Sequence, residues 1–125
     1  MNNLNLIGRL TKNVEVRNIK NTENKIATFV IAVDRDFTKK DGTRDTDFIP
    51  VEFGGSIAEF CERNLTKGRL VAVEGALQID SWTNDQGEKK TYTKVRGKRI
   101  QPLDKKKIEA NFASSAVTDD ELPFE

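Results

Sequence analysis

Short apolar stretches separated by turn signals extend from residue 3 to residue 103, a pattern typical of an all-β domain. Residues 3–10 and 14–17 predict a first pair of strands. Residues 26–33 are apolar on both alternating faces, as in a strand that is buried on both sides. We expect this strand near the centre of the sheet.

Two hairpins follow from the turn residues. Lys39-Lys40-Asp41-Gly42 predicts a tight turn in which Gly42 supplies a positive φ, and residues 46–53 return as the partner strand. A second, longer hairpin is predicted, with strands at residues 69–82 and 89–100 and a turn at residues 84–87.

One short helix is predicted between the two hairpins. Gly54-Gly55 ends the preceding strand, Ser56 and Glu59 have the spacing of a capping box, and Gly68 ends the helix. Its apolar face is expected to comprise Ile57, Phe60, Cys61 and Leu65. The predicted order is strands, then one short helix between strands 3 and 4, and then a final long hairpin. This order is typical of a five-stranded Greek-key barrel of the oligonucleotide-binding (OB) type.

Composition narrows the class of protein. The length of 125 residues suits one domain, and no apolar run approaches the length of a membrane span. The first residues lack the pattern of a signal peptide, so we expect a cytoplasmic protein with no membrane partner. Cys61 is the single cysteine and histidine is absent, which leaves no zinc site and no histidine-based catalysis. We therefore expect no enzyme and no cofactor.

Four aspartates near the first hairpin offer one alternative, a magnesium site for phosphoryl transfer. They alternate with Arg35 and Arg44, so salt bridges within the hairpin are the favoured interpretation. These aspartates are Asp34, Asp36, Asp45 and Asp47.

The last hairpin carries the strongest functional signal. Alternate side chains of a strand face opposite sides of the sheet, so Asp80 and Trp82 lie on one face and Leu77 and Ile79 on the other. Trp82 is therefore expected to point away from the core. On the returning strand an aromatic side chain and four cations share a parity: Lys90, Tyr92, Lys94, Arg96 and Lys98.

The first hairpin has a similar composition near its tip, with Arg35, Phe37, Lys39, Lys40, Arg44 and Phe48. Single-stranded nucleic acid requires cations interleaved with aromatics, because cations neutralise phosphates while exposed bases stack on rings. Alternatives remain at this point. The cations also suit a solvated β surface, Trp82 suits the rim of the core, and Phe37 and Phe48 suit the core itself.

Charge is distributed unevenly along the chain. Residues 109–125 carry a formal charge of −5, whereas residues 1–108 carry +6. Such a terminal charge block predicts a disordered interaction segment, with a simple solubility tail as the alternative. Leu122 and Phe124 favour the interaction segment, because exposed apolar side chains gain free energy when a partner buries them.

Three stretches resemble the bacterial and phage single-stranded DNA-binding protein (SSB) family. They are residues 1–17, residues 27–47 with the following Phe48-Ile49-Pro50, and residues 81–87 leading to Tyr92-Thr93. The resemblance implies an OB-fold domain at residues 1–103, commonly assembled as a homotetramer, around which single-stranded DNA wraps without sequence preference.

Individual roles follow from the same resemblance. It implies base stacking at Phe37, Phe48 and Trp82 and phosphate contacts at Lys40 and Lys67. The family usually has a further aromatic six residues after Phe48, whereas this chain has Phe53 one position earlier. Phe53 is therefore a candidate for stacking or for the core, depending on the register.

The end of the chain also resembles the family, whose members typically end in Asp-Asp-Asp-Leu-Pro-Phe and bind replication, recombination and repair proteins through that peptide. The corresponding residues are Asp119, Asp120, Glu121, Leu122, Pro123 and Phe124. Glu125 extends past the usual terminal Phe, and residues 104–118 form a linker shorter than the family's, compatible with a phage or plasmid origin. Two alternatives to a DNA-coating protein remain, an OB-fold accessory of replication restart and an RNA-binding OB protein.

Overall fold

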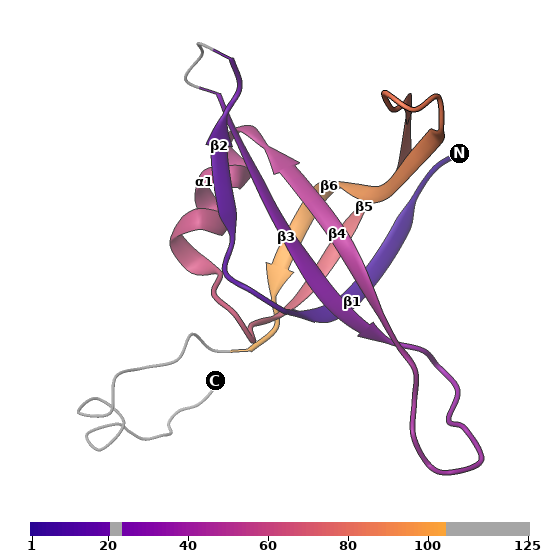
Figure 1. Ribbon diagram of the computed structural model, residues 1–125. Coiled ribbons are helices and arrows are strands. Elements are labelled where there is room, and N and C mark those ends of the chain that lie inside the picture. The colour runs from indigo at the N-terminus through magenta and orange to yellow at the C-terminus, as the bar shows by residue number, and fades with distance from the viewer. Residues whose placement is uncertain (21–23, 105–125) are drawn as a thin grey trace, which may run out of the picture.

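The computed structural model describes residues 1–20 and 24–104, which form a closed β-barrel with one helix (Figure 1). In chain order the elements are β1 (Leu4–Leu10), β2 (Glu15–Asn18), β3 (Lys25–Asp34), β4 (Thr46–Gly54), α1 (Gly55–Asn64), β5 (Leu70–Thr83) and β6 (Lys89–Pro102). This mostly β chain with one short helix after β4 has the OB-fold that the sequence predicted.

The barrel closes through β1. The strand order is β1-β5-β6-β4-β3-β2, and β1 also pairs with β3 at Leu10↔Ile31. β2 then continues along β3 at Glu15↔Thr28. The expected pairing of residues 3–10 with residues 14–17 is therefore wrong, because β1 pairs along β5 and reaches β3 only at its end, whereas β2 pairs with β3. Together β1 and β2 form the first strand of the five-stranded barrel, interrupted between Leu10 and Glu15.

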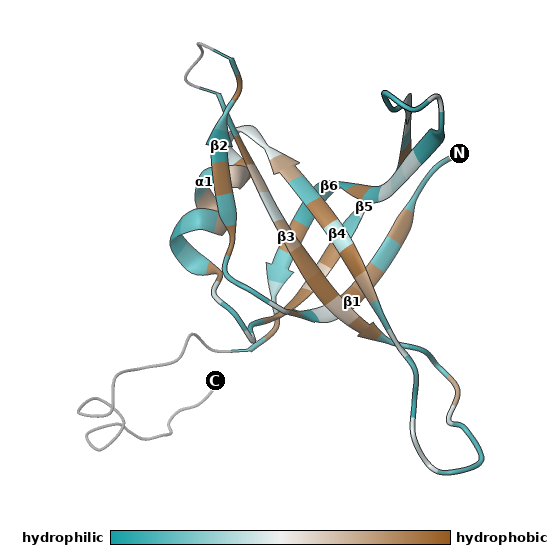
Figure 2. Ribbon diagram, in the orientation of Figure 1, coloured by the Kyte–Doolittle hydropathy of each residue, from teal (hydrophilic) through white to brown (hydrophobic). Residues whose placement is uncertain are grey.

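The core consists of buried side chains from β1, β3, β4, β5 and β6 together with residues of α1, and Val16 of β2 packs against it. Hydrophobic residues recur along the strands of the barrel (Figure 2). On β3 the core side chains are Ala27, Phe29 and Ile31, and the other face of this strand is only half-buried. β3 pairs with β1, β2 and β4, so its expected central position is confirmed.

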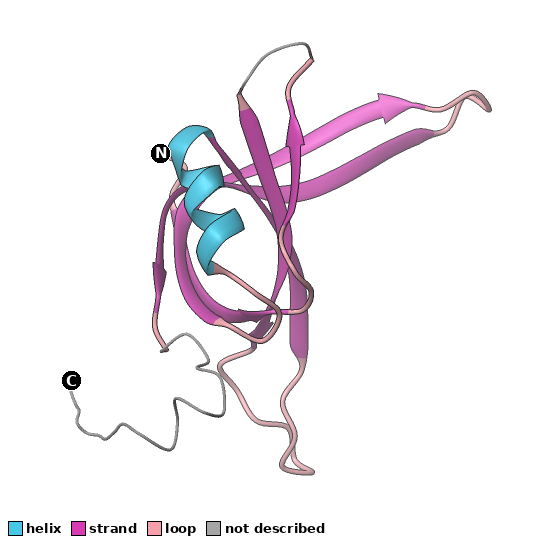
Figure 3. Cartoon of the chain, turned by 90° about the vertical axis from the view of Figure 1, so that its left-hand side faces the viewer, coloured by secondary structure: helices cyan, strands magenta, loops and turns pink. Residues whose placement is uncertain are grey.

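Helix α1 covers one end of the barrel (Figure 3). Its N-cap is Gly54, and no side chain caps its first turn. The expected capping box is wrong because Ser56 already lies inside the helix. Ala58 and Cys61 are buried against the barrel, whereas Phe60 is partly exposed, contrary to expectation. Burial raises the pKa of the Cys61 thiol to about 12, which leaves it an unreactive core side chain.

Both predicted hairpin turns are present and project from the barrel (Figures 1 and 3). The Gly42 N–H donates to the Lys39 carbonyl at 2.9 Å with φ +89° at Gly42. The Gly87 N–H donates to the Asn84 carbonyl at 3.0 Å with φ +78° at Gly87. These positive φ angles explain why glycine occupies both turns.

Asp104, just after β6, is hydrogen-bonded to residues at the start of β5. Its carboxylate accepts from Arg69 Nε at 2.8 Å and from the Leu70 N–H at 3.2 Å. The barrel thus includes this first residue of the predicted linker. The rest of that linker and the acidic tip at residues 119–125 lie outside the described residues. No helix within residues 1–20 and 24–104 is long and apolar enough to span a membrane.

Candidate nucleic-acid interface

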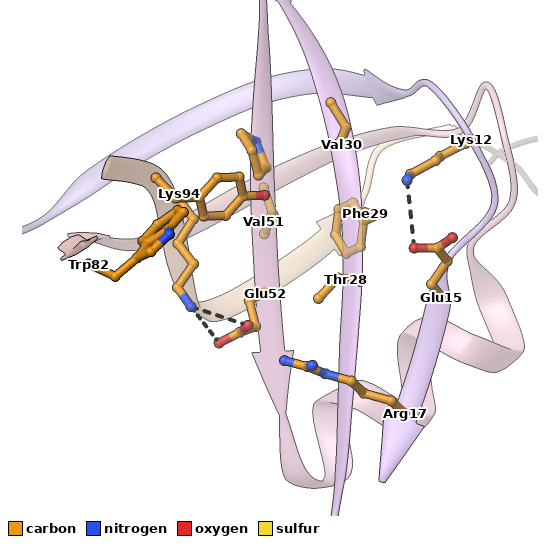
Figure 4. A pocket seen from close by; sticks show the side chains of 12 residues that line it. Lys12, Glu15, Arg17, Thr28, Phe29, Val30, Val51, Glu52, Trp82 and Lys94 are labelled. Atoms are coloured by element: carbon orange, nitrogen blue, oxygen red, sulfur yellow. Dashed lines mark hydrogen bonds and ion pairs between the residues drawn. The ribbon is translucent and has the colours of Figure 1, made fainter. Parts of the chain in front are cut away.

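A groove of about 660 Å³ runs between the β5–β6 hairpin and β2 (Figure 4). Its floor is the outer face of β3 and β4, where Thr28 pairs with Glu52 and Val30 with Pro50. Trp82, Tyr92 and Lys94 line the hairpin side, and Lys12, Glu15 and Arg17 line the opposite side.

Two aromatic side chains of the β5–β6 hairpin face this groove. Trp82 pairs with Lys90 and Asp80 pairs with Tyr92, so all four side chains project from the same face of the ribbon. Trp82 is 50% exposed and Tyr92 is 47% exposed. The expectation that Trp82 points away from the core is confirmed.

The opposite face of the same ribbon is also exposed. Leu77 and Ile79 have the parity of the core residues Val71 and Val73, yet they are largely exposed. The reason is length, since the hairpin extends past the barrel and nothing in the described part of the chain covers its tip (Figure 1).

Phe37 and Phe48 lie on the surface, at 60% and 66% exposure, so the alternative that placed them in the core is wrong. Phe48 pairs with Ala32 and projects from the same face of β4 as Pro50. It therefore extends the groove floor along β4 with an aromatic ring. Phe37 lies in the β3–β4 loop, apart from the residues that line the groove.

Phe53 is a core residue, and its candidacy as a stacking residue is corrected. It is 1% exposed, and its ring stacks on Phe29 with centroids 6.1 Å apart. The register Ala27↔Phe53 places it on the inner face, with no bulge in β4 to turn it outward.

The cations at the base of the β5–β6 hairpin are largely neutralised by acids. Lys94 Nζ lies 3.4 Å from Glu52 and 3.1 Å from Asp80, and Arg96 lies 3.2 Å from Glu52. Burial lowers the pKa of Lys94, but the Asp80 hydrogen bond and the Glu52 charge outweigh it and hold that pKa above its ordinary value. Hydrogen bonds from Gln78 and Lys94 hold the pKa of Asp80 below its usual range.

The acids of the β3–β4 loop also form ion pairs. Arg35 donates through Nε and Nη2 to both oxygens of Asp47, each at 3.0 Å, and Lys39 lies 2.7 Å from Asp45. The Arg35 hydrogen bonds hold the pKa of Asp47 below its usual range.

Salt bridges within the hairpin, the favoured interpretation, are confirmed for Asp45 and Asp47. Asp34 instead accepts a hydrogen bond from Thr46 Oγ1 at 2.7 Å, and Arg44 donates to Thr38 Oγ1 at 3.2 Å. Within the described ranges no group of three or more His, Cys, Asp or Glu residues is placed to hold a metal ion.

Several predicted phosphate-binding cations are exposed and form no ion pair within residues 1–20 and 24–104. They are Lys40, Arg44, Lys67, Lys90 and Lys98. Lys98 lies at a bulge, because Gly97 pairs with Gly75 and Arg99 pairs with Glu74. The alternation that grouped Lys98 with Arg96 therefore does not extend through this position.

The sequence pattern missed four charged residues of the groove: Lys12, Glu15, Arg17 and Glu52. Lys12 and Glu15 form an ion pair with each other at 3.6 Å. Glu52 is 8% exposed at the floor, and its parity with Phe48 was the signal that placed it there. Arg17 projects from β2 toward the floor (Figure 4). Its position carried no such signal, because only the pairing of β2 with β3 brings it to the groove.

The barrel has an open groove with aromatic rings on one side and cations near it. On an OB barrel these features are typical of the class of proteins that bind oligonucleotides. Comparison with known proteins narrows this class. The model of the single-strand binding protein family matches residues 1–103, and the chain belongs to that family.

Curated relatives match over most of the chain. Single-stranded DNA-binding protein 1 of Clostridium acetobutylicum is 41% identical over 107 residues, covering 86% of this chain and 97% of the relative. Single-stranded DNA-binding protein 1 of Streptococcus pyogenes is 37% identical over 130 residues, covering 99% of each. The Caldanaerobacter subterraneus protein is 36% identical over 121 residues, covering 97% of this chain and 78% of the relative.

Proposed function

We propose that this protein binds single-stranded DNA without sequence preference and acts without catalysis. The observation that carries the proposal is the placement of Trp82 and Tyr92 on one side of a groove whose floor continues to the exposed ring of Phe48. Each stacked base contributes about 1 to 3 kcal/mol, whatever its identity. Duplex DNA gains little there, because its base faces are already stacked.

The exposed cations supply the electrostatic part of binding. Lys90 is directly opposite Trp82, and Arg17 lines the other side of the groove, so phosphates on either side of a stacked base have a cation within reach. Lys40 and Arg44 are exposed in the β3–β4 loop, which also carries the exposed ring of Phe37, and they offer further cations apart from the groove. Binding of this kind weakens with salt because phosphate contacts release counterions.

A wider role follows from the family and from the acidic tip. We propose that the protein coats single-stranded DNA during replication, recombination and repair, as a homotetramer. Residues 119–124 would recruit partner proteins, with Leu122 and Phe124 buried in the partner and the acids facing its cations. The short linker keeps this tip near the basic barrel, so it competes with DNA at low salt. Removing residues 109–125 should therefore raise DNA affinity at low salt, and an equal affinity would contradict the competition.

A titration of labelled oligonucleotides separates the proposal from its alternatives. Oligothymidine should bind far more tightly than duplex DNA or an RNA oligonucleotide of equal length. Equal or tighter binding of RNA would favour an RNA-binding protein, and weak binding of all three would favour a protein-binding accessory. The mass of the free protein and of its oligothymidine complex tests the tetramer.

A further inference from the structure

We infer that Glu52 is a specificity-determining residue, which excludes phosphates from the groove floor and thereby selects exposed bases over other polyanions. The inference rests on the proposed function, because it concerns how a bound strand is oriented in the same groove. The bases face the floor, and the backbone lies toward the rim.

Glu52 has an unusual place for a carboxylate in a groove expected to bind a polyanion. Its side chain is 9% exposed and lies at the floor, between the aromatic hairpin and β2 (Figure 4). It contacts Lys94 at 3.4 Å and Arg96 at 3.2 Å, and Asp80 contacts Lys94 at 3.1 Å. Two cations and two acids cancel, so the base of the hairpin has no net charge to attract phosphate.

A phosphate that entered the floor would approach a carboxylate that solvent and salt screen poorly. The phosphate has no hydrogen-bond donor for this carboxylate, because a phosphodiester and a carboxylate are both acceptors. A base differs on both counts, since it is uncharged and its Watson–Crick edge carries amino or imino N–H groups that a carboxylate accepts. In a duplex those groups are already paired, so this benefit is restricted to single strands.

The other lining residues favour the same orientation of the strand, with bases at the floor. Val30 and Pro50 give the floor an apolar surface beside Trp82 and Tyr92, which suits a base face and not a phosphate. Arg17 comes from β2 on the far side of the groove, projects toward the floor (Figure 4) and forms no ion pair within residues 1–20 and 24–104, which leaves its guanidinium available to the backbone. Free positive charge thus lies on the β2 side, whereas the charges around Glu52 on the hairpin side are balanced.

The charge of Glu52 is removed by Glu52→Gln, which preserves its shape. The full chain is titrated with oligothymidine, with duplex DNA of equal length and with heparin, a polyanion without bases. Affinity for heparin and duplex should rise about tenfold, because Lys94 and Arg96 become available to anions. Affinity for oligothymidine should change less, so the preference for the single strand over heparin falls.

The matched control is Glu74→Gln, which removes one acid from an ion pair with Arg99 outside the groove. Its preference for the single strand should equal that of the wild type. An equal fall in both variants would mean that net charge alone matters, and no fall in Glu52→Gln would mean that Glu52 has no part in selection. Either result overturns the inference.

A purely structural role for Glu52 has a different signature. If it only braces Lys94 and Arg96, Glu52→Gln weakens binding of all three ligands together, and the inference fails. If that variant does not fold, Asp80→Asn removes a charge from the same cluster at a more exposed position and should lower the preference in the same direction. An unchanged preference in Asp80→Asn would then overturn it. Failure of the wild type to bind oligothymidine would instead reject the proposed function.

Discussion

Gly97 of β6 lies against the ring of Phe53 in β4, with no room between them for a side-chain carbon. A Cβ on Gly97 would overlap three atoms of that ring. Gly97 also pairs with Gly75 across the β5–β6 ladder, next to the bulge at Lys98. A glycine in this strand therefore allows a large aromatic side chain to fill the barrel interior.

The first prediction concerns this contact. Gly97→Ala should lower the free energy of unfolding by about 1 to 3 kcal/mol, because a methyl group must displace the Phe53 ring in a packed core. Urea denaturation monitored by circular dichroism measures the change. Phe53→Leu in the same chain should relieve part of it, so the two substitutions together should cost less than their sum. Additive costs would show that the two residues do not act through this contact.

The two phenylalanines of β4 should respond oppositely to the same substitution. Phe48→Leu should weaken oligothymidine binding and leave stability nearly unchanged, because its ring is 66% exposed. Phe53→Leu should lower the free energy of unfolding by about 1 kcal/mol or more and leave the affinity of the folded protein unchanged. Loss of DNA affinity in the folded Phe53→Leu variant would restore Phe53 as a stacking residue.

Trp82→Ala should weaken oligothymidine binding by about 1 to 3 kcal/mol, which is roughly a 5-fold to 150-fold change, through loss of one stacked base. The barrel should remain folded, because Trp82 is half exposed near the end of a projecting hairpin. Trp82→Phe is the matched control and should retain most of the affinity. Anisotropy of labelled oligothymidine gives the affinities, and thermal denaturation checks the fold. An unfolded Trp82→Ala variant would place the indole in the core.

Asp104 should make stability depend on pH. Burial favours its protonated form, but hydrogen bonds from Leu70 and Arg69 outweigh this and hold the pKa of Asp104 below its usual range. The folded pKa lies below the unfolded value of about 3.9, so the contribution is complete at neutral pH and disappears as pH falls through the folded pKa.

Asp104→Asn should therefore lower the free energy of unfolding by about 1 to 2 kcal/mol at pH 7 and by less at pH 3, below the unfolded pKa. Urea denaturation at the two pH values measures both. Asp85→Asn in the exposed hairpin turn is the charge-matched control and should have little effect at either pH. An equal loss at both pH values would contradict a role that depends on the Asp104 charge.

Local signals predicted most of the fold. Gly42 and Gly87 marked the two turns, and alternation placed Trp82 on an outer face, because both depend on neighbours in the chain. Register over long distances was harder. The pairing of β2 with β3 instead of β1 and the bulge at Lys98 arise from closure of the barrel, which no local pattern records.

The candidate site shows the same division. Alternation along the strand predicted the outward position of Trp82, whereas the residues alone left Phe48 open between core and surface and only the family resemblance implied stacking there. The stripe of cations on β6 did not have the free charge that its composition indicated, because Glu52 comes from β4 and reaches Lys94 and Arg96 only through the parallel pairing of β4 with β6. The sequence contained this carboxylate, but its partners depend on the tertiary fold.

The fluorescence of Trp82, the only tryptophan, tests the central claim most directly, because stacking of a base on the indole quenches its emission. Oligothymidine should quench it to saturation, with log affinity falling against log salt by about 0.7 for each phosphate neutralised. Duplex DNA of equal length should quench it weakly at the same concentrations. No quenching by oligothymidine, or equal quenching by the duplex, would contradict single-strand binding in this groove.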